Sequence, residues 1–171
     1  MTFDYTSMGF YTFDALCRPV TEIPPGGDTF FVDDFALAVS GAAGSAAIVA
    51  AKHGLNVQAV GGVGDDLMGD WVLRRLGDFG VDTANMQRIP DMMTSSSIVT
   101  TRPDGARPAL HKRGATAGFY VDDAALGRVI DESGAAAWLG ETLSLGLAYL
   151  PPALVLAAIM AFVTFITNFA S

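Results

Sequence analysis

Residues 56–83 read NVQAVGGVGDDLMGDWVLRRLGDFGVDT, and this stretch decides which fold class the chain can adopt. Its opening residues, 56–60, predict a short β-strand. The following GGVGDD predicts a loop, and residues 67–79 have the apolar spacing of an amphipathic helix that ends before Gly80. Asp65 and Asp66 could form a metal site or an acid pair, but a charge effect at the start of this helix is the simpler interpretation.

A second stretch, SGAAGSAAIVAAKHG at residues 40–54, predicts a turn of small residues that leads into a helix at residues 45–53. Such a turn could hold a phosphate, could let a substrate lie against bare backbone, or could serve helix packing alone. It lacks the Gly-Lys-Ser/Thr ending of a Walker loop and the G-x-G-x-x-G spacing of a dinucleotide-binding turn. Gly41 and Ala42 nevertheless leave room for a ligand close to the main chain.

The elements around these stretches predict an α/β fold with parallel strands in its core, because strands and helices alternate along the chain. A turn is expected at Pro24–Gly27, and a helix from Ala124. The further strands expected are residues 5–13, ending near Asp14; residues 29–39, as one or two strands bent at Asp33 and Asp34; and residues 94–101 with 107–112, as a hairpin that could form a small separate sheet.

Charge and composition exclude several classes of function. The net charge of −8 argues against nucleic acid or an anionic membrane surface as a general partner, because phosphate binding requires clustered positive charge. The single cysteine, Cys17, excludes an intrachain disulfide and an all-cysteine metal site. His53 and His111 do not have the spacing of metal ligands. The sequence therefore predicts no metal site.

The order of these features resembles the N-terminal half of the ribokinase-like (PfkB-like) carbohydrate kinases. The similarity lies in the turn and helix of residues 40–54, the loop Gly62–Gly69 (GVGDDLMG), and Asp14 after the first strand. It implies a partial ribokinase-like sheet with flanking helices and a small lid hairpin at residues 1–130. It also implies a cytoplasmic enzyme that uses ATP and Mg²⁺ to phosphorylate a hydroxyl of a sugar or nucleoside.

The resemblance places five residues around a small polyhydroxylated substrate: Thr12, Asp14, Gly41, Ala42 and Ser45. Asp14 occupies the position where the family has an aspartate that binds sugar hydroxyls. Ser40 and Ser45 stand where the family has a glycine and an asparagine, so the substrate is expected to differ from an ordinary sugar. Lys112 and Arg113, in the lid region, could face an anionic group or could belong to a solvated strand edge.

The catalytic half of this family has no counterpart in the sequence. In the family, a G-A-G-D-type motif in the second half supplies the base and an anion hole, and the family pattern here stops after Arg128. General-base catalysis requires such a carboxylate near the attacking hydroxyl. We therefore expect no catalytic residue in this chain, and binding without phosphoryl transfer. The sequence leaves the oligomeric state open.

The C-terminal segment has a different character, because residues 142–171 carry no charge. Residues 132–171 resemble part of a divalent anion:sodium symporter (DASS-type) transporter, which makes residues 131–171 a separate segment. The apolar run 153–169 could span a membrane, although a buried helix of a soluble core is the alternative. Membrane contact through residues 142–171, with membrane association in place of a cytoplasmic location, is thus a second hypothesis. A natural fusion, a frameshifted gene and a designed chimera are all consistent with a junction near residue 130.

Overall fold

The computed structural model describes residues 3–120, 123–132, 134–147, 151, 154–155 and 160. The chain divides into two compact units, Met1–Ser133 and Gly134–Ser171. This division reflects packing within each unit alone. That residues 1–130 and 131–171 come from different families therefore stays a prediction.

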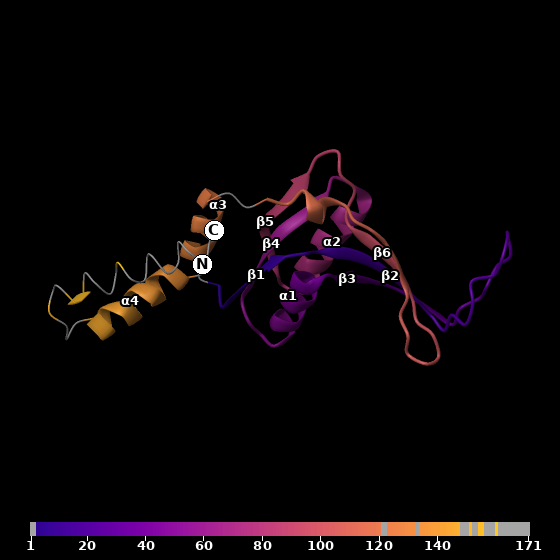
Figure 1. Ribbon diagram of the computed structural model, residues 1–171, viewed down its shortest axis with the longest axis horizontal. Coiled ribbons are helices and arrows are strands. Elements are labelled where there is room, and N and C mark those ends of the chain that lie inside the picture. Colours follow the sequence, from indigo (N-terminus) through magenta and orange to yellow (C-terminus); the bar gives the residue numbers. More distant parts are fainter. Residues whose placement is uncertain are drawn as a thin grey trace. The chain divides into compact units, whose positions relative to one another are not determined.

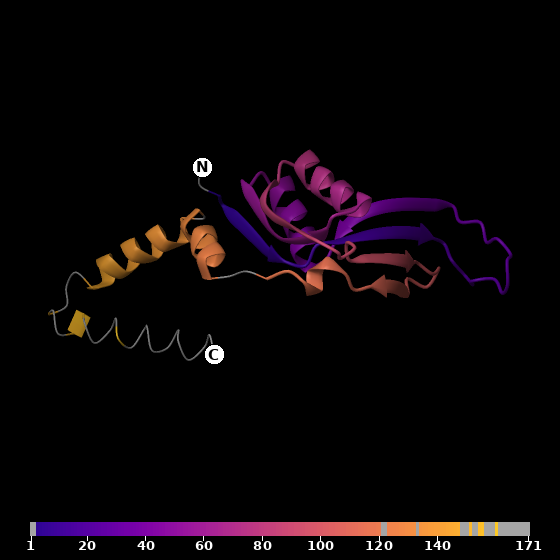
Figure 2. The same cartoon turned by 90° about the horizontal axis from the view of Figure 1, so that it is seen from above.

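A three-stranded parallel sheet forms the centre of the first unit, with the strand order β1-β4-β5. Two helices, α1 and α2, cover one face of this sheet, and the short 3-10 helix η1 lies on the other (Figures 1 and 2). Parallel neighbours require crossover connections, which these helices provide. The predicted α/β class is therefore confirmed. The bounds are Tyr5–Gly9 (β1), Val57–Gly64 (β4), Asp82–Ile89 (β5), Ala42–Lys52 (α1), Leu67–Asp78 (α2) and Ala115–Ala117 (η1).

A second sheet of four strands, in the order β3-β2-β6-β7, extends from the first (Figure 1). Strand β2 runs antiparallel to β3 and parallel to β6, and β6 and β7 form an antiparallel hairpin. The hairpin is therefore confirmed, but it belongs to a larger sheet, which we call the lid sheet. The bounds are Thr12–Arg18 (β2), Asp34–Ser40 (β3), Ser96–Thr100 (β6) and Ala109–Lys112 (β7).

The core of the first unit lies between the parallel sheet and its two helices. Val57 and Val63 of β4 and Val72 and Leu76 of α2 are fully buried. Each such side chain contributes about 1.5–3 kcal/mol through burial. Tyr11 is also fully buried, and its hydroxyl donates a 2.8 Å hydrogen bond to the Ser7 carbonyl oxygen. Tyr11 therefore ties the connection between β1 and β2 to the core.

The strand predicted at residues 5–13 is in fact two strands that belong to different sheets. The chain turns at Gly9, which has a φ of 141°, and β2 begins at Thr12. The prediction that a strand ends near Asp14 is therefore wrong, because Asp14 lies inside β2. The strand predicted within residues 29–39 is a single one, β3, which begins at Asp34.

The glycines predicted to form a loop after β4 are part of that strand. A Cβ atom on Gly61 would overlap the Tyr11 ring, and one on Gly62 would press on Phe119 and Ala115. Glycine is therefore needed at these positions for tight packing on both faces of the sheet, and not for a turn. Helix α1 begins at Ala42, earlier than predicted, and β5 was not predicted at all.

The remaining described helices are α3, Asp123–Glu132, in the first unit, and α4, Ala135–Leu147, in the second. The helix expected from Ala124 corresponds to α3. The predicted apolar run 153–169 lies outside the described residues except for positions 154–155 and 160. Within the described residues, no helix has both the length and the apolar character needed to cross a membrane.

Candidate functional site

Strand β2 brings Thr12 and Asp14 to one face of the lid sheet. Side chains alternate along a strand, so Phe13 and Ala15 lie on the opposite face. There the rings of Phe13 and of Trp71 from α2 pack edge to face, with 5.2 Å between ring centroids. Thr12 and Asp14 are each only 9% exposed. The sequence therefore places a carboxylate and a hydroxyl side by side in a largely buried position.

Asp14 has very few partners for so buried a carboxylate. The Thr12 hydroxyl donates to its Oδ1 atom over 3.3 Å. Within the described part of the chain, no other hydrogen bond and no ion pair to Asp14 is found. An ionised carboxylate can accept about four hydrogen bonds. Asp14 therefore keeps most of its capacity for the hydroxyl groups of a ligand.

The face that carries Asp14 continues as a polar row across the lid sheet. Asp14 pairs in register with Ser97 of β6, and Ser97 pairs with His111 of β7. The Ser97 hydroxyl and Nδ1 of His111 lie 3.0 Å apart and share a hydrogen bond. The sequence did not single out Ser97, and it gave His111 no role. Their alignment with Asp14 depends on strand register, which follows only from the assembled sheet.

The turn between β3 and α1 packs tightly on the chain between β1 and β2. Gly41 has a φ of 82°, and a Cβ atom there would lie less than 3.0 Å from the Phe10 carbonyl oxygen. This position therefore requires glycine for both its backbone conformation and its close approach. Ala42 and Ser45, in the first turn of α1, are exposed, and no side chain caps this helix.

A cleft of about 440 Å³ lies where the lid sheet, the α1 turn and η1 meet. Two of the five residues expected around the substrate, Thr12 and Gly41, line it. Ala42, Ser45 and Asp14 are not among the lining residues, although Asp14 shares a face of β2 with Thr12. The cleft is lined by Phe10, Thr12, Gly41, His111, Arg113, Thr116 and Ala117. The role of the five predicted residues in binding stays a prediction.

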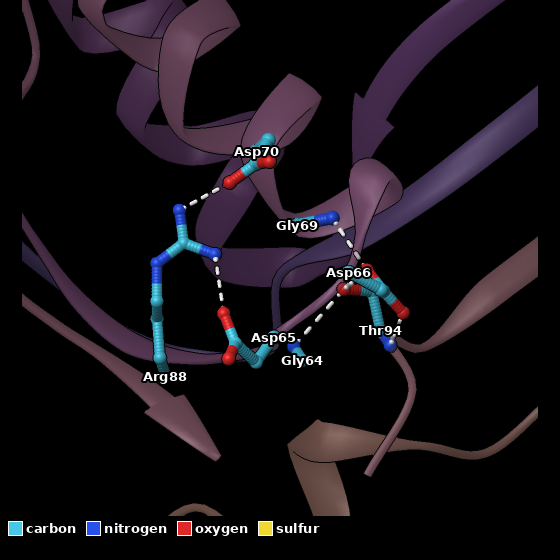
Figure 3. Close-up of polar contacts among 7 residues, drawn as sticks. All are labelled: Gly64, Asp65, Asp66, Gly69, Asp70, Arg88 and Thr94. Atoms are coloured by element: carbon cyan, nitrogen blue, oxygen red, sulfur yellow. Dashed lines mark hydrogen bonds and ion pairs between the residues drawn. The ribbon is translucent and has the colours of Figure 1, made fainter. Parts of the chain in front are cut away.

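Asp66 connects the parallel sheet to the start of the lid hairpin (Figure 3). Asp66 is the N-cap of α2: its Oδ1 atom accepts hydrogen bonds from the Gly69 amide and from the Thr94 hydroxyl, at 2.8 and 2.6 Å. Its Oδ2 atom accepts the Thr94 amide at 2.7 Å, and the Thr94 hydroxyl accepts the Gly64 amide at 3.0 Å. Partial burial raises the pKa of Asp66, but the bonds from Thr94 and Gly69 outweigh this effect and lower it below the usual value.

Asp65 differs from Asp66 in its contacts. It forms an exposed ion pair with Arg88 of β5, and Arg88 also pairs with Asp70 of α2 (Figure 3). Asp66 acts at the helix start, as the simpler interpretation expected, and it also holds Thr94. Among the residues that the structure describes, no three His, Cys, Asp or Glu side chains are grouped so that they could hold a metal ion.

Comparison with known proteins agrees with this arrangement. Residues 12–141 match the model of the pfkB family of carbohydrate kinases. This match passes the predicted junction near residue 130, and the comparisons give no support to a transporter fragment. No curated protein matches the chain significantly.

Several solved structures share the fold. A ribokinase from Arabidopsis thaliana, described in complex with ribose and ATP, is 22% identical, with a TM-score of 0.58 over 67% of this chain and 37% of its own. A fructokinase from Xylella fastidiosa is 25% identical, with a TM-score of 0.55 over 70% of this chain and 36% of its own. A nucleoside kinase from Methanocaldococcus jannaschii is 20% identical, with a TM-score of 0.53 over 65% and 37%.

The chain thus spans little more than a third of the length of these solved relatives. The lid sheet, strands β4 and β5 of the parallel sheet and the glycine-rich β4–α2 connection lie within the region that the family model matches, and β1 precedes it. Since that region makes up most of the sequence, the chain belongs to the pfkB family of carbohydrate kinases.

Proposed function

We propose that this chain provides the substrate-binding face of an ATP-dependent kinase that acts on a hydroxyl group of a small polyhydroxylated substrate, a carbohydrate or a nucleoside. The observation that carries the proposal is the state of Asp14, which is nine-tenths buried on the same face of β2 as the cleft residue Thr12 and accepts one hydrogen bond from it. A buried carboxylate is costly unless hydrogen bonds compensate it. Hydroxyl groups of a ligand would supply those bonds.

We propose a division of roles between the cleft residues Thr12 and Gly41 and three residues outside its lining, Asp14, Ala42 and Ser45. Asp14 accepts hydrogen bonds from two neighbouring substrate hydroxyls, and Thr12 holds one of its oxygens in place. Gly41, which lines the cleft, presents its backbone to the substrate. Ala42 and Ser45 lie exposed in the first turn of α1, so we propose that they contact only the outer part of the substrate.

We further propose that this chain binds its substrate without phosphorylating it. A kinase needs a base near the attacking hydroxyl and groups that stabilise the transferring phosphoryl. No carboxylate lines the described cleft, and we assign Asp14, which lies outside that lining, to substrate binding. The described residues also offer no cluster of carboxylates that fits Mg²⁺, so we assign no step of the reaction to a metal here. The cytoplasmic location that we propose rests on the resemblance to the ribokinase-like kinases alone.

Isothermal titration calorimetry with ribose, fructose, ribitol and adenosine tests the binding proposal. Asp14→Ala should weaken the tightest of these interactions by about 1.5–3 kcal/mol, the range for hydrogen bonds to a charged group. Asp65→Ala, which removes an exposed carboxylate outside the cleft, is the matched control and should leave affinity unchanged. Equal affinity of the folded Asp14→Ala variant and the wild type would place the site elsewhere.

An assay with ATP tests the second proposal separately. Phosphorylated product should not form from any compound that binds, with or without Mg²⁺. Turnover at an ordinary kinase rate, above about 1 per second, would contradict binding without catalysis.

A further inference from the structure

Arg113 is a cation of the cleft that lacks an anionic partner. Three other arginines pair with aspartates: Arg18 with Asp34, Arg75 with Asp78, and Arg88 with Asp65 and Asp70. Among the described residues, Arg113 shares the lack of an ion pair with Arg74, Arg102, Arg107 and Arg128, and it differs from them because it lines this cleft. Arg113 makes no hydrogen bond and no ion pair within the residues that the structure describes. The residues that line the cleft with it include no acid. The cleft therefore has an uncompensated positive charge at the wall formed by the lid.

The backbone next to Arg113 is held in place. The Gly114 amide donates to the hydroxyl of the fully buried Ser95 at 2.9 Å, and the Ala115 amide donates to the Met93 carbonyl at 2.8 Å. A Cβ atom on Gly114 would lie less than 3.0 Å from that same carbonyl oxygen. Arg113 thus projects from a fixed point of the chain, although its side chain is exposed.

Lys112, the preceding residue, occupies the other side of the lid sheet. It ends β7 in register with Ser96, and it lines a separate cleft with Phe13 and Ile98. Successive residues of a strand face opposite ways. Arg113 therefore borders the cleft that contains Thr12 and Gly41, and Lys112 does not.

We infer that Arg113 selects a substrate that carries a carboxylate, such as a sugar acid, and binds that carboxylate at the lid side of the cleft. This inference rests on the proposed function, because it concerns the same bound molecule. A planar guanidinium can hold a carboxylate through two parallel hydrogen bonds. One arginine balances one negative charge, whereas a phosphate ester carries close to two at neutral pH.

The two charged groups of the site also fix the direction of such a substrate. Asp14 repels the substrate's carboxylate and accepts its hydroxyls, while Arg113 attracts the carboxylate. The hydroxyl end is therefore held at β2 and the acid end at the lid. The cleft volume of about 440 Å³ lies within the usual range for pockets that take small ligands.

Calorimetry with matched pairs of compounds tests this inference on the whole chain. The pairs are gluconate with glucitol and ribonate with ribitol, measured at low ionic strength, with ribose 5-phosphate as a separate probe. Each acid should bind at least about tenfold more tightly than its neutral partner, the low end for a hydrogen-bonded charged group. Arg113→Gln should remove this preference. Lys112→Gln should keep the preference, and Arg113→Lys should keep part of it.

The outcomes separate this inference from the proposed function. Neutral polyols that bind through Asp14, with no advantage for the acids, would overturn the role of Arg113 alone. A preference for acids that survives Arg113→Gln would do the same. Tighter binding of ribose 5-phosphate than of ribonate would overturn the assignment to a carboxylate. If no polyol binds in an Asp14-dependent manner, neutral or acidic, the proposed function fails and this inference fails with it.

Discussion

Replacing Asp66 by alanine should destabilise the first unit far more than any other single carboxylate substitution in the β4–α2 connection. The side chain accepts hydrogen bonds from the Gly69 amide, the Thr94 amide and the Thr94 hydroxyl, at 2.6–2.8 Å. Thr94 is fully buried. Its amide would therefore lose its partner in a place where water does not easily replace it.

The magnitude follows from these contacts. Loss of a helix N-cap costs about 1 kcal/mol. Each of the two bonds to Thr94 adds about 1 kcal/mol net, and a stranded buried amide costs about 1–3 kcal/mol. These terms overlap, so we expect Asp66→Ala to lower the free energy of unfolding by about 3 kcal/mol. That is a large share of the stability of an ordinary domain, about 5–15 kcal/mol.

Urea denaturation followed by tryptophan fluorescence and circular dichroism measures this loss. Asp65→Ala is the control, because Asp65 makes only an exposed ion pair, worth less than about 1 kcal/mol. A double-mutant cycle of Asp66→Ala with Thr94→Ala should give a coupling energy of at least about 1 kcal/mol. Equal losses for Asp66→Ala and Asp65→Ala, or additive effects in the cycle, would refute the reasoning.

The pH dependence gives a second check on the same group. Its hydrogen bonds lower the pKa of Asp66 in the folded protein, so the folded state favours the ionised form. The stability that it contributes is therefore full above the ordinary carboxyl pKa of about 4 and is lost as the pH falls through the lowered folded value. The difference between wild type and Asp66→Ala should accordingly be constant near pH 7 and shrink in acid.

Three further outcomes are expected. Burial raises the pKa of Tyr11 to about 12, so the stability of the wild type should fall as the pH rises from about 10 to 12. Tyr11→Phe should lower the free energy of unfolding by about 1–2 kcal/mol at pH 7 and abolish that fall, and denaturation at alkaline pH measures both effects. Gly41→Ala should lower the melting temperature and weaken polyol binding, because its Cβ atom would collide with the Phe10 carbonyl oxygen; unchanged melting would show that the turn adapts. Removal of residues 134–171 should raise the soluble fraction without detergent, because residues 142–171 carry no charge and are rich in apolar side chains. A truncated chain that precipitates while the full chain stays soluble would contradict this.

Local patterns allowed much of the fold to be predicted from the sequence. The helix predicted at residues 67–79 agrees with α2 to within one residue, because its apolar spacing and the Asp66 cap are local signals. The extension of β4 through Gly61 and Gly62 was missed, because those glycines are needed for contacts with Tyr11 and Phe119, which are distant in sequence. In the sequence alone, a glycine-rich loop and a glycine-rich, tightly packed strand have the same pattern.

Only part of the candidate site could be predicted from the sequence, because its residues also come together through contacts that are distant in sequence. Asp14 and Gly41 stood out through a family resemblance and a small-residue turn. Ser97 and Thr116 joined the site only through strand register and the position of η1. Thr116 is held there by a 2.6 Å hydrogen bond with Ser95. No short-range pattern marks such residues, because their neighbours in space come from different strands.

The central claim is that the polar face of the lid sheet binds a polyhydroxylated ligand through Asp14. Two-dimensional amide NMR of the ¹⁵N-labelled chain, titrated with ribitol and with ribonate, tests it most directly. The account predicts saturable shifts at Thr12, Gly41 and Thr116, small changes at Ala15 and Lys112 on the opposite face, and loss of all these shifts in a folded Asp14→Asn variant. Shifts that centre on Ala15 and Lys112, or that persist unchanged in Asp14→Asn, would contradict it.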